Sequence, residues 1–306
     1  MANKRNLTAG IVIAAVVLGI LVWRPTVLIY GLQAAGLYAS IAIPMGLILG
    51  IVHIVNLAHG EFMMVASYLT YMVCRATGMD PYLALVPVAA ITAIFGFGIY
   101  KLTIRQALKA PELNQLILTF GLAILLTQAA NLAFTSQTRK ISFDYVSASV
   151  DIGELSFGVY NFVFVAIAVA MVVGLRLFLT RTTTGKAALA VGQNPRGAAI
   201  VGIDVDRAYA LTFTLASALV GMMGAVFITR SSIFPAVGSP FTMKSFCLIA
   251  MAGVGNIPGI LASSVLLGVS ENFLKAFRGT RDWADIVFFV LIITVILGRS
   301  IRGKKA

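Results

Sequence analysis

Long apolar runs separated by short polar connections make up most of the chain. A helix crosses the hydrocarbon core of a bilayer in about 20 predominantly apolar residues. Most of the runs approach or exceed that length, although residues 61–74 are short for a span. We expect eight membrane-crossing helices, at residues 7–23, 27–52, 61–74, 83–100, 116–134, 159–179, 209–228 and 283–297.

A further apolar segment, residues 245–270, is interrupted by glycine and proline. The interruption runs from Gly253 to Gly259 and includes Gly255 and Pro258. A regular helix cannot continue through it, because glycine is flexible and proline lacks the backbone donor. The pattern predicts two half-helices that meet at a bend, in a broken or re-entrant pair. The expected fold is an all-α polytopic membrane protein with about eight transmembrane helices plus this pair, in a single transmembrane domain over residues 1–306.

The composition excludes a water-soluble fold. Apolar residues make up 59% of the 306 residues, charged residues make up 11%, and the mean hydropathy is +0.97. Soluble domains average about 25% charged residues, so this chain could not cover a water-facing surface. Its two cysteines lie inside apolar runs and are expected to pack there rather than to form a disulfide framework.

The net charge of +12 is concentrated in the connections. Basic residues gather at the amino terminus, in residues 101–112 and 176–207, and in the tail 299–305. Cytoplasmic loops of membrane proteins carry an excess of Lys and Arg, so we assign these segments, and with them both termini, to the cytoplasm. The charge is therefore attributed to orientation in lipid and not to nucleic-acid binding. The first run has no small-residue cleavage site after it and is expected to remain as a span.

The connection at residues 180–207 is long enough to fold. Thr184 could cap a turn that starts at Gly185, and Pro195 could open a second short helix that ends near Gly202. Two small helices on the cytoplasmic face would form a docking surface. The alternative is a plain connecting loop, although loops of this length are usually functional or disordered.

A few polar residues lie within or between the apolar runs. Asn56, His59 and Glu61 could line a translocation path, or they could satisfy backbone groups at a helix break, which is the interpretation we prefer. Gln128 and Asn131 are three residues apart and share one helix face, where they could face a pore or bond a neighbouring helix. A separate acidic residue, Glu271, is expected at the membrane interface.

Motifs for membrane enzymes are missing from the sequence. The dipeptide Gly185-Lys186 is followed by Ala187 and lacks the glycine spacing of a nucleotide-binding loop. The sequence contains no G-x-S-x-G or H-E-x-x-H motif. We therefore expect a transport subunit that is not an enzyme and binds no cofactor or metal of its own.

Four stretches, taken together, resemble the permeases of branched-chain amino-acid ABC importers, the leucine/isoleucine/valine type. Residues 50–64 are similar to that family's I-V-N-x-A-H-G-E-F signature. Residues 184–207 resemble its cytoplasmic loop, residues 210–225 the helix that follows, and residues 253–259 its glycine-rich bend. The resemblance extends over residues 27–298, and it is closest to the family's first permease subunit.

The resemblance implies a bacterial inner-membrane subunit with several partners. It implies a second, homologous permease, a periplasmic substrate-binding protein, and two ATPase subunits that carry ATP-Mg. The coupling residues that it implies are Gly185, Lys186, Pro195, Ala198, Ala199 and Gly202. Relatives in the family also carry urea, amides or aromatic carboxylates, and an ion-coupled secondary carrier is the alternative from another class.

Overall fold

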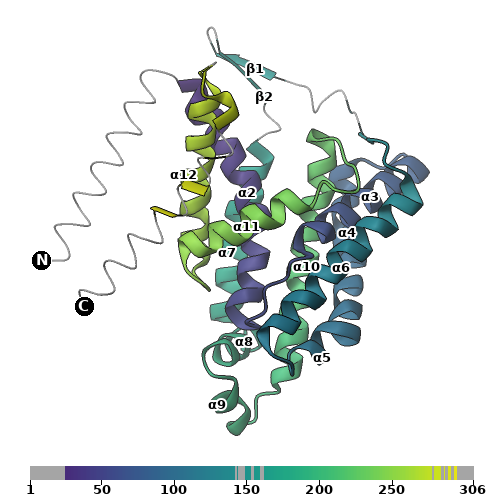
Figure 1. Ribbon diagram of the computed structural model, residues 1–306, viewed down its shortest axis with the longest axis vertical. Helices are drawn as coiled ribbons and strands as arrows, with labels where there is room; N and C mark the ends of the chain where they lie inside the picture. The colour runs from purple at the N-terminus through teal and green to yellow at the C-terminus, as the bar shows by residue number, and fades with distance from the viewer. Residues whose placement is uncertain are drawn as a thin grey trace, which may run out of the picture.

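The computed structural model describes residues 25–141, 143, 149–152, 155–158, 162–277, 279–283, 286, 289–290 and 293–294. Within these residues the chain is nearly all helical (Figure 1). The expected first span, 7–23, lies outside the described residues, and so does most of the expected last span, 283–297. The ends of the chain, whose cytoplasmic location the charge pattern predicts, also lie outside them.

Ten helices of six residues or more are described. They are α2 (Pro25–Ile51), α3 (His59–Thr77), α4 (Pro81–Ile99), α6 (Glu112–Phe134), α7 (Phe162–Arg181), α8 (Thr183–Gln193), α9 (Pro195–Ile200), α10 (Val205–Arg230), α11 (Ser239–Ala252) and α12 (Ile257–Lys275). A π-helical turn, η1 (Tyr100–Ile104), and the short α5 (Arg105–Ala107) continue α4, and a 3₁₀ turn, η4 (Arg281–Trp283), follows α12. The strands β1 (Ser149–Ile152) and β2 (Leu155–Gly158) pair antiparallel.

Six of the described helices are long and apolar enough to cross a membrane. They are α2, α4 with its continuation to Ala107, α6, α7, α10 and α12. The exposed side chains of α4 and α7 include large apolar residues such as Leu83, Ile94 and Val173. Lipid-facing helices carry such surfaces, so the protein is a multi-pass membrane protein.

Several sequence expectations differ from the structure. The expected count of eight spans is not confirmed, because six candidate spans are described and the segment at 61–74 is part of α3, which does not qualify. The bend at residues 253–256 is present, but α12 is a full candidate span rather than a half-helix. The polar connection after residue 100 continues as helix to Ala107, and the β1–β2 hairpin departs from an all-α fold.

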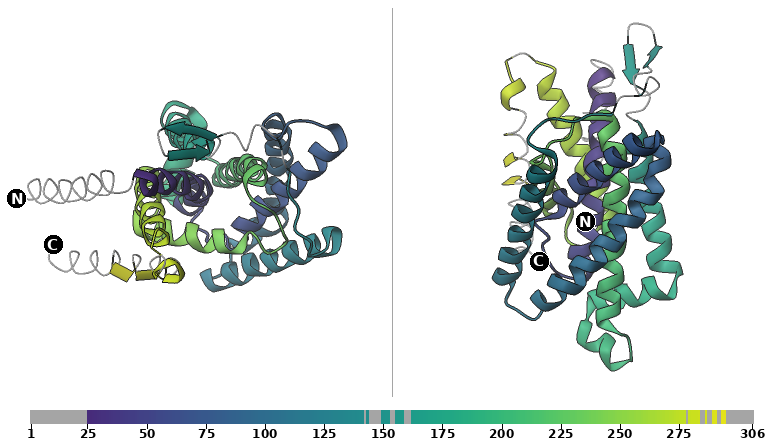
Figure 2. Two further views of the ribbon diagram at one scale, coloured as in Figure 1. Left: turned by 90° about the horizontal axis from the view of Figure 1, so that it is seen from above. Right: turned by 90° about the vertical axis from the view of Figure 1, so that its right-hand side faces the viewer.

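Helix α2 forms the centre of the bundle. Figure 2 shows it (purple) between α7, α10 and α12 in the view from above. Glycines on α2 allow this close approach, because a Cβ at Gly36 would lie 2.5 Å from the Val165 nitrogen of α7, and one at Gly31 would lie 2.8 Å from the Val269 Cα of α12. Small residues let membrane helices pack backbone to backbone.

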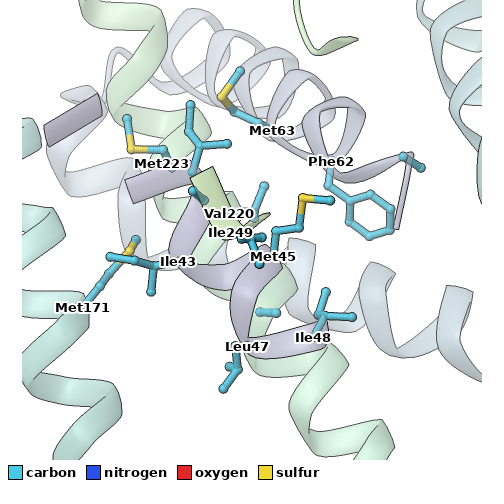
Figure 3. Close-up of a cluster of buried hydrophobic side chains, with 14 of the residues drawn as sticks. Ile43, Met45, Leu47, Ile48, Phe62, Met63, Met171, Val220, Met223 and Ile249 are labelled. Carbon is cyan, nitrogen blue, oxygen red and sulfur yellow. The ribbon is translucent and has the colours of Figure 1, made fainter. Parts of the chain in front are cut away.

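The largest apolar cluster lies where α2, α3 and α10 meet. Ile43 and Met45 of α2, Phe62 and Met63 of α3, and Met223 of α10 are all nearly inaccessible to solvent (Figure 3). Methionine fills irregular gaps because its side chain is unbranched and flexible. The amino-terminal turn of α3 is therefore packed against the middle of α2.

Candidate functional site

The α8–α9 pair protrudes from one end of the bundle (Figure 1). Thr182 caps α8 by accepting a hydrogen bond from the Gly185 nitrogen at 3.0 Å, so the cap lies two residues before the expected Thr184. Asn194 caps α9 by accepting from the Gly197 nitrogen at 2.9 Å, and Pro195 occupies the first turn. These caps explain why two short helices form here instead of a loop.

The six residues predicted for coupling differ in their exposure to solvent. Gly185 and Ala198 are buried, and a Cβ at Gly185 would lie 2.1 Å from the Phe178 carbonyl oxygen of α7. Lys186, Ala199 and Gly202 are exposed, and Pro195 is half-buried. The first two residues therefore fix the fold of the pair, and the exposed three lie on its surface.

The end of α9 presents two large apolar side chains to solvent. Ile200 is 85% exposed and Val201 is 75% exposed. Gly202 follows with a φ of 87°, a left-handed conformation that favours glycine. The coupling residues expected from the sequence do not include Ile200 and Val201, although the run Ala198 to Val201 in a polar connection is a signal for this apolar tip.

The base of the α8–α9 pair contacts the end of α2 and the α11–α12 bend. A Cβ added at Gly192 of α8 would lie 3.0 Å from the Gly50 carbonyl oxygen. On the other side, a Cβ added at Gly50 would lie 2.8 Å from the Gly255 Cα. Backbone therefore packs on backbone from α8 through α2 to the bend.

The bend between α11 and α12 is made by two glycines and a cap. Gly253 and Gly255 have φ angles of 93° and 76°, which other residues rarely adopt. Asn256 then caps α12 by accepting from the Gly259 nitrogen at 3.0 Å, and Pro258, an exposed residue, occupies the first turn of α12. The local sequence thus ends one helix and starts the next.

Asn56 and His59 organise the link between α2 and α3. The Asn56 side-chain oxygen accepts from the Ala58 nitrogen at 3.1 Å. His59 Nε2 donates to the Ile41 carbonyl oxygen at 2.7 Å, and Ile41 lies well inside α2. Both polar side chains are buried. The chain therefore turns back along α2, and α3 starts beside the middle of that helix.

Glu61 lies where the amino termini of α3 and α11 meet. The Gly60 nitrogen donates to Thr242 Oγ1 of α11 at 2.7 Å, and that hydroxyl lies 3.5 Å from Glu61 Oε2. A Cβ at Gly60 would lie 2.0 Å from the Gly238 carbonyl oxygen, so the two helix ends touch. Helix amino termini carry partial positive charge, so the Glu61 side chain lies beside two such helix ends.

Gln128 and Asn131 lie elsewhere, on α6. The Asn131 amide donates to Gln128 Oε1 at 3.4 Å, as their three-residue spacing predicts. Gln128 is exposed within a candidate span. The structure does not bring this pair together with Asn56, His59 and Glu61, which are buried inside the bundle.

A buried ion-pair network joins α2, α11 and α12. Lys244 Nζ of α11 lies 2.7 Å from Glu271 Oε1 of α12 and 3.1 Å from the Tyr38 hydroxyl of α2. The Tyr38 hydroxyl donates to the other carboxylate oxygen, Glu271 Oε2. Lys275 Nζ lies 3.6 Å from the same oxygen. Glu271 is 0% exposed, so its carboxylate lies inside the helix bundle.

The members of this network are not connected by any pattern in the sequence. A single lysine in the apolar stretch of α11 and a single glutamate in α12 were the available signal, because charges inside membrane segments are costly unless they are paired. The pairing itself depends on the bend, which brings α11 and α12 together. Among the described residues, no group of three or more His, Cys, Asp or Glu is placed to hold a metal ion.

Comparison with known proteins assigns the family. The family described as "Branched-chain amino acid transport system / permease component" matches residues 27–296. The chain belongs to this family. The match covers all ten helices described above except the first two residues of α2.

Relatives in the branched-chain permease family align over most of their length. The high-affinity branched-chain amino acid transport system permease protein LivH of Salmonella typhimurium is 28% identical over 282 residues, which cover 87% of this chain and 91% of the relative. The corresponding protein BraD of Pseudomonas aeruginosa is 28% identical over 285 residues, covering 89% and 92%. A probable LivH of Methanocaldococcus jannaschii is 25% identical over 275 residues, covering 87% of each chain. No solved structure matches this chain.

Family membership identifies a permease component of a transport system. The relatives are named as permease components of transport systems for branched-chain amino acids. The α8–α9 pair, the α3–α11 junction and the buried network all lie within the matched residues. These three features are therefore the candidate working parts of a branched-chain permease.

Proposed function

We propose that this chain is a permease subunit of an ATP-driven importer of branched-chain amino acids in the bacterial inner membrane. In this proposal the whole chain, residues 1–306, is one transmembrane domain. Its partners are a second homologous permease, a periplasmic substrate-binding protein and two ATPases that hold ATP-Mg. The names and near full-length alignment of the relatives support the substrate class.

The observation that carries the proposal is the apolar tip of the α8–α9 pair. Ile200 and Val201 project from the end of α9, and they are more exposed than most apolar side chains of the membrane helices. Exposed apolar groups with polar neighbours are typical of protein interaction sites. We assign residues 180–207 as the cytoplasmic coupling loop, in which Lys186, Ala199 and Gly202 lie near the docked ATPase.

The backbone contacts at the base of the pair suggest how movement is transmitted. Gly192 of α8 packs on Gly50 of α2, which packs on Gly255 in the bend. Interdigitated backbones cannot slide independently, because packed interiors deform little. A displacement of α8–α9 by the ATPases would therefore move the end of α2 and the bend together, and tilt α11 and α12.

The remaining polar residues have separate roles in this proposal. Asn56, His59 and Glu61 hold the helix break from which α3 starts, since each is buried and hydrogen-bonded within the bundle. Gln128 and Asn131 of α6 line the translocation path, since an exposed amide within a span is costly against lipid.

The proposal is tested by placing a charge on the apolar tip. Ile200→Asp should abolish ATPase co-purification and lower leucine uptake by about tenfold, because a carboxylate in an apolar contact costs more than about 1.4 kcal/mol. Gln137→Asp adds the same charge close to Arg139, whose backbone pairs with Ile233 beyond the end of α10 that is farther from α9, and it should leave both readouts unchanged.

Three outcomes would contradict the proposal in different ways. Normal ATPase binding by Ile200→Asp would remove the tip from the coupling surface. Uptake of urea, an amide or an aromatic carboxylate in place of leucine would keep the architecture and replace the substrate. Uptake that survives ATP depletion and collapses with the ion gradient would identify a secondary carrier.

A further inference from the structure

A cleft of about 390 Å³ opens at the end of the bundle away from α8 and α9. It lies between the amino-terminal half of α2, the first turn of α7, and the last turns of α10 and α12. The volume lies within the range of about 300–1,000 Å³ that is usual for small-molecule sites. No motif in the sequence indicated this cleft.

One cation lies at the rim of this cleft. Arg230 ends α10 and is exposed, and the described residues that line the cleft include no acidic residue. The ion pairs of the described residues do not include Arg230. A guanidinium group binds a carboxylate through two parallel hydrogen bonds, so Arg230 is suited to an anionic ligand.

Two amide side chains lining the cleft offer acceptors. Gln33 Nε2 donates to the Gly158 carbonyl oxygen at 3.4 Å, and Asn272 Nδ2 donates to the Gly268 carbonyl oxygen at 2.9 Å. Each amide nitrogen is therefore directed at backbone, which leaves the amide oxygen to accept. An ammonium group is a donor that suits such oxygens.

Apart from Ser231, which follows Arg230 and adds a hydroxyl group, the rest of the described lining is largely apolar. Leu37 and Ala34 of α2 and Phe164 of α7 line it, together with the Tyr30 ring. A small aliphatic side chain could pack on these residues. The cleft therefore combines a cation, two neutral acceptors and an apolar wall within one space.

We propose that this cleft is a binding subsite for a zwitterionic aliphatic α-amino acid. Arg230 binds the carboxylate, Gln33 and Asn272 accept from the ammonium group, and Leu37 and Phe164 contact the side chain. The inference rests on the proposed function, because that function supplies the amino acid at this end of the protein. An anionic lipid headgroup shares the chemistry that Arg230 recognises, and the experiment separates the two ligands.

The test measures weak ligand binding to the tagged chain in lipid nanodiscs by saturation-transfer NMR, with any co-purified partners retained. Leucine is the first probe. Arg230→Gln should lower the leucine signal by about tenfold, as loss of a charge-assisted contact of about 1.4 kcal/mol would. Arg281→Gln removes an exposed arginine that does not line the cleft, and it should match the wild type.

A second probe separates the roles of the two ends of the ligand. The compound 4-methylpentanoate keeps the carboxylate and the aliphatic chain of leucine but lacks the ammonium group. Asn272→Leu should weaken the leucine signal and leave that of 4-methylpentanoate unchanged, whereas Arg230→Gln should weaken both. Arg230→Lys keeps the charge without the planar fork and should give an intermediate leucine signal.

Two results would overturn the proposal that the cleft binds an amino acid. An Arg230→Gln variant that elutes as the wild type does and binds leucine equally would overturn the proposal. Loss of co-purified phosphatidylglycerol in that variant, with an unchanged leucine signal, would assign Arg230 to a lipid and also overturn it. Deleting the gene tests the proposed function separately: unchanged leucine uptake would refute the function, whereas lost uptake with an unaffected Arg230→Gln signal would refute the cleft alone.

Discussion

At the scale of single residues, the most consequential feature is a carboxylate with no access to solvent. Glu271 forms an ion pair with Lys244 of α11 and accepts a hydrogen bond from the Tyr38 hydroxyl of α2. Lys275, which also pairs with it, lies on the same helix as Glu271. The Lys244 ammonium also lies 4.7 Å from the centre of the Tyr38 ring, which adds a cation–π contact. The network therefore fixes α11 across α2 and α12 through charge rather than through shape alone.

Removing one partner of this ion pair should destabilise the protein more than removing both. Glu271→Gln leaves Lys244 without its counter-charge, and breaking a buried pair costs about 3–5 kcal/mol. The double variant Lys244→Met with Glu271→Gln removes both charges and should recover most of that loss. Thermal unfolding in detergent measures the difference, and Lys275→Met, whose side chain is 45% exposed, serves as the control.

A double variant that is as unstable as Glu271→Gln alone would contradict this account. That result would mean that the lysine and the glutamate contribute through separate contacts. Equal stability of all three variants and the wild type would show that the network does not contribute to holding α11 in place.

At the scale of elements, the local sequence predicts where helices start and stop better than where they lie. The bend, the two short helices and the Pro195 start follow from glycine, proline and asparagine within a few residues, so they can be predicted. The start of α3 beside the middle of α2 depends on the Ile41 carbonyl oxygen, eighteen residues before His59, and the sequence pattern carries no sign of it.

The contact between α2 and the bend gives a prediction at this scale. Gly50→Ala places a Cβ 2.8 Å from the Gly255 Cα, so the backbones must separate. We expect ATP hydrolysis to continue while leucine uptake falls by about tenfold, because the bend no longer follows the end of α2. Gly98→Ala, which has no atom within 4 Å of the added Cβ, should leave transport and hydrolysis unchanged.

Both activities must be measured on the same reconstituted membranes. Parallel loss of hydrolysis and uptake in Gly50→Ala would indicate a failure of assembly, and full retention of both would show that the contact does not transmit movement. Gly255→Ala separates backbone strain from a steric clash. The φ of 76° at this position strains an alanine, whereas the nearest atom to the added Cβ is 3.9 Å away.

At the scale of the whole molecule, composition and family resemblance predict more than the span count does. The membrane class follows from 59% apolar and 11% charged residues, and the family is confirmed over residues 27–296. The Arg230 cleft and the Lys244 network could not be predicted, because each joins residues from three or four separate helices. Candidate sites of this kind depend on packing between distant segments, which a local pattern does not encode.

The central claim is that this permease works as one subunit of an ATP-driven complex. The most direct measurement is purification of the tagged chain from its native membrane in mild detergent, with the co-purified proteins identified by mass spectrometry. The account predicts an ABC-type ATPase and a second permease of the same family in the purified complex. Recovery of the chain alone from membranes that still take up leucine would contradict it.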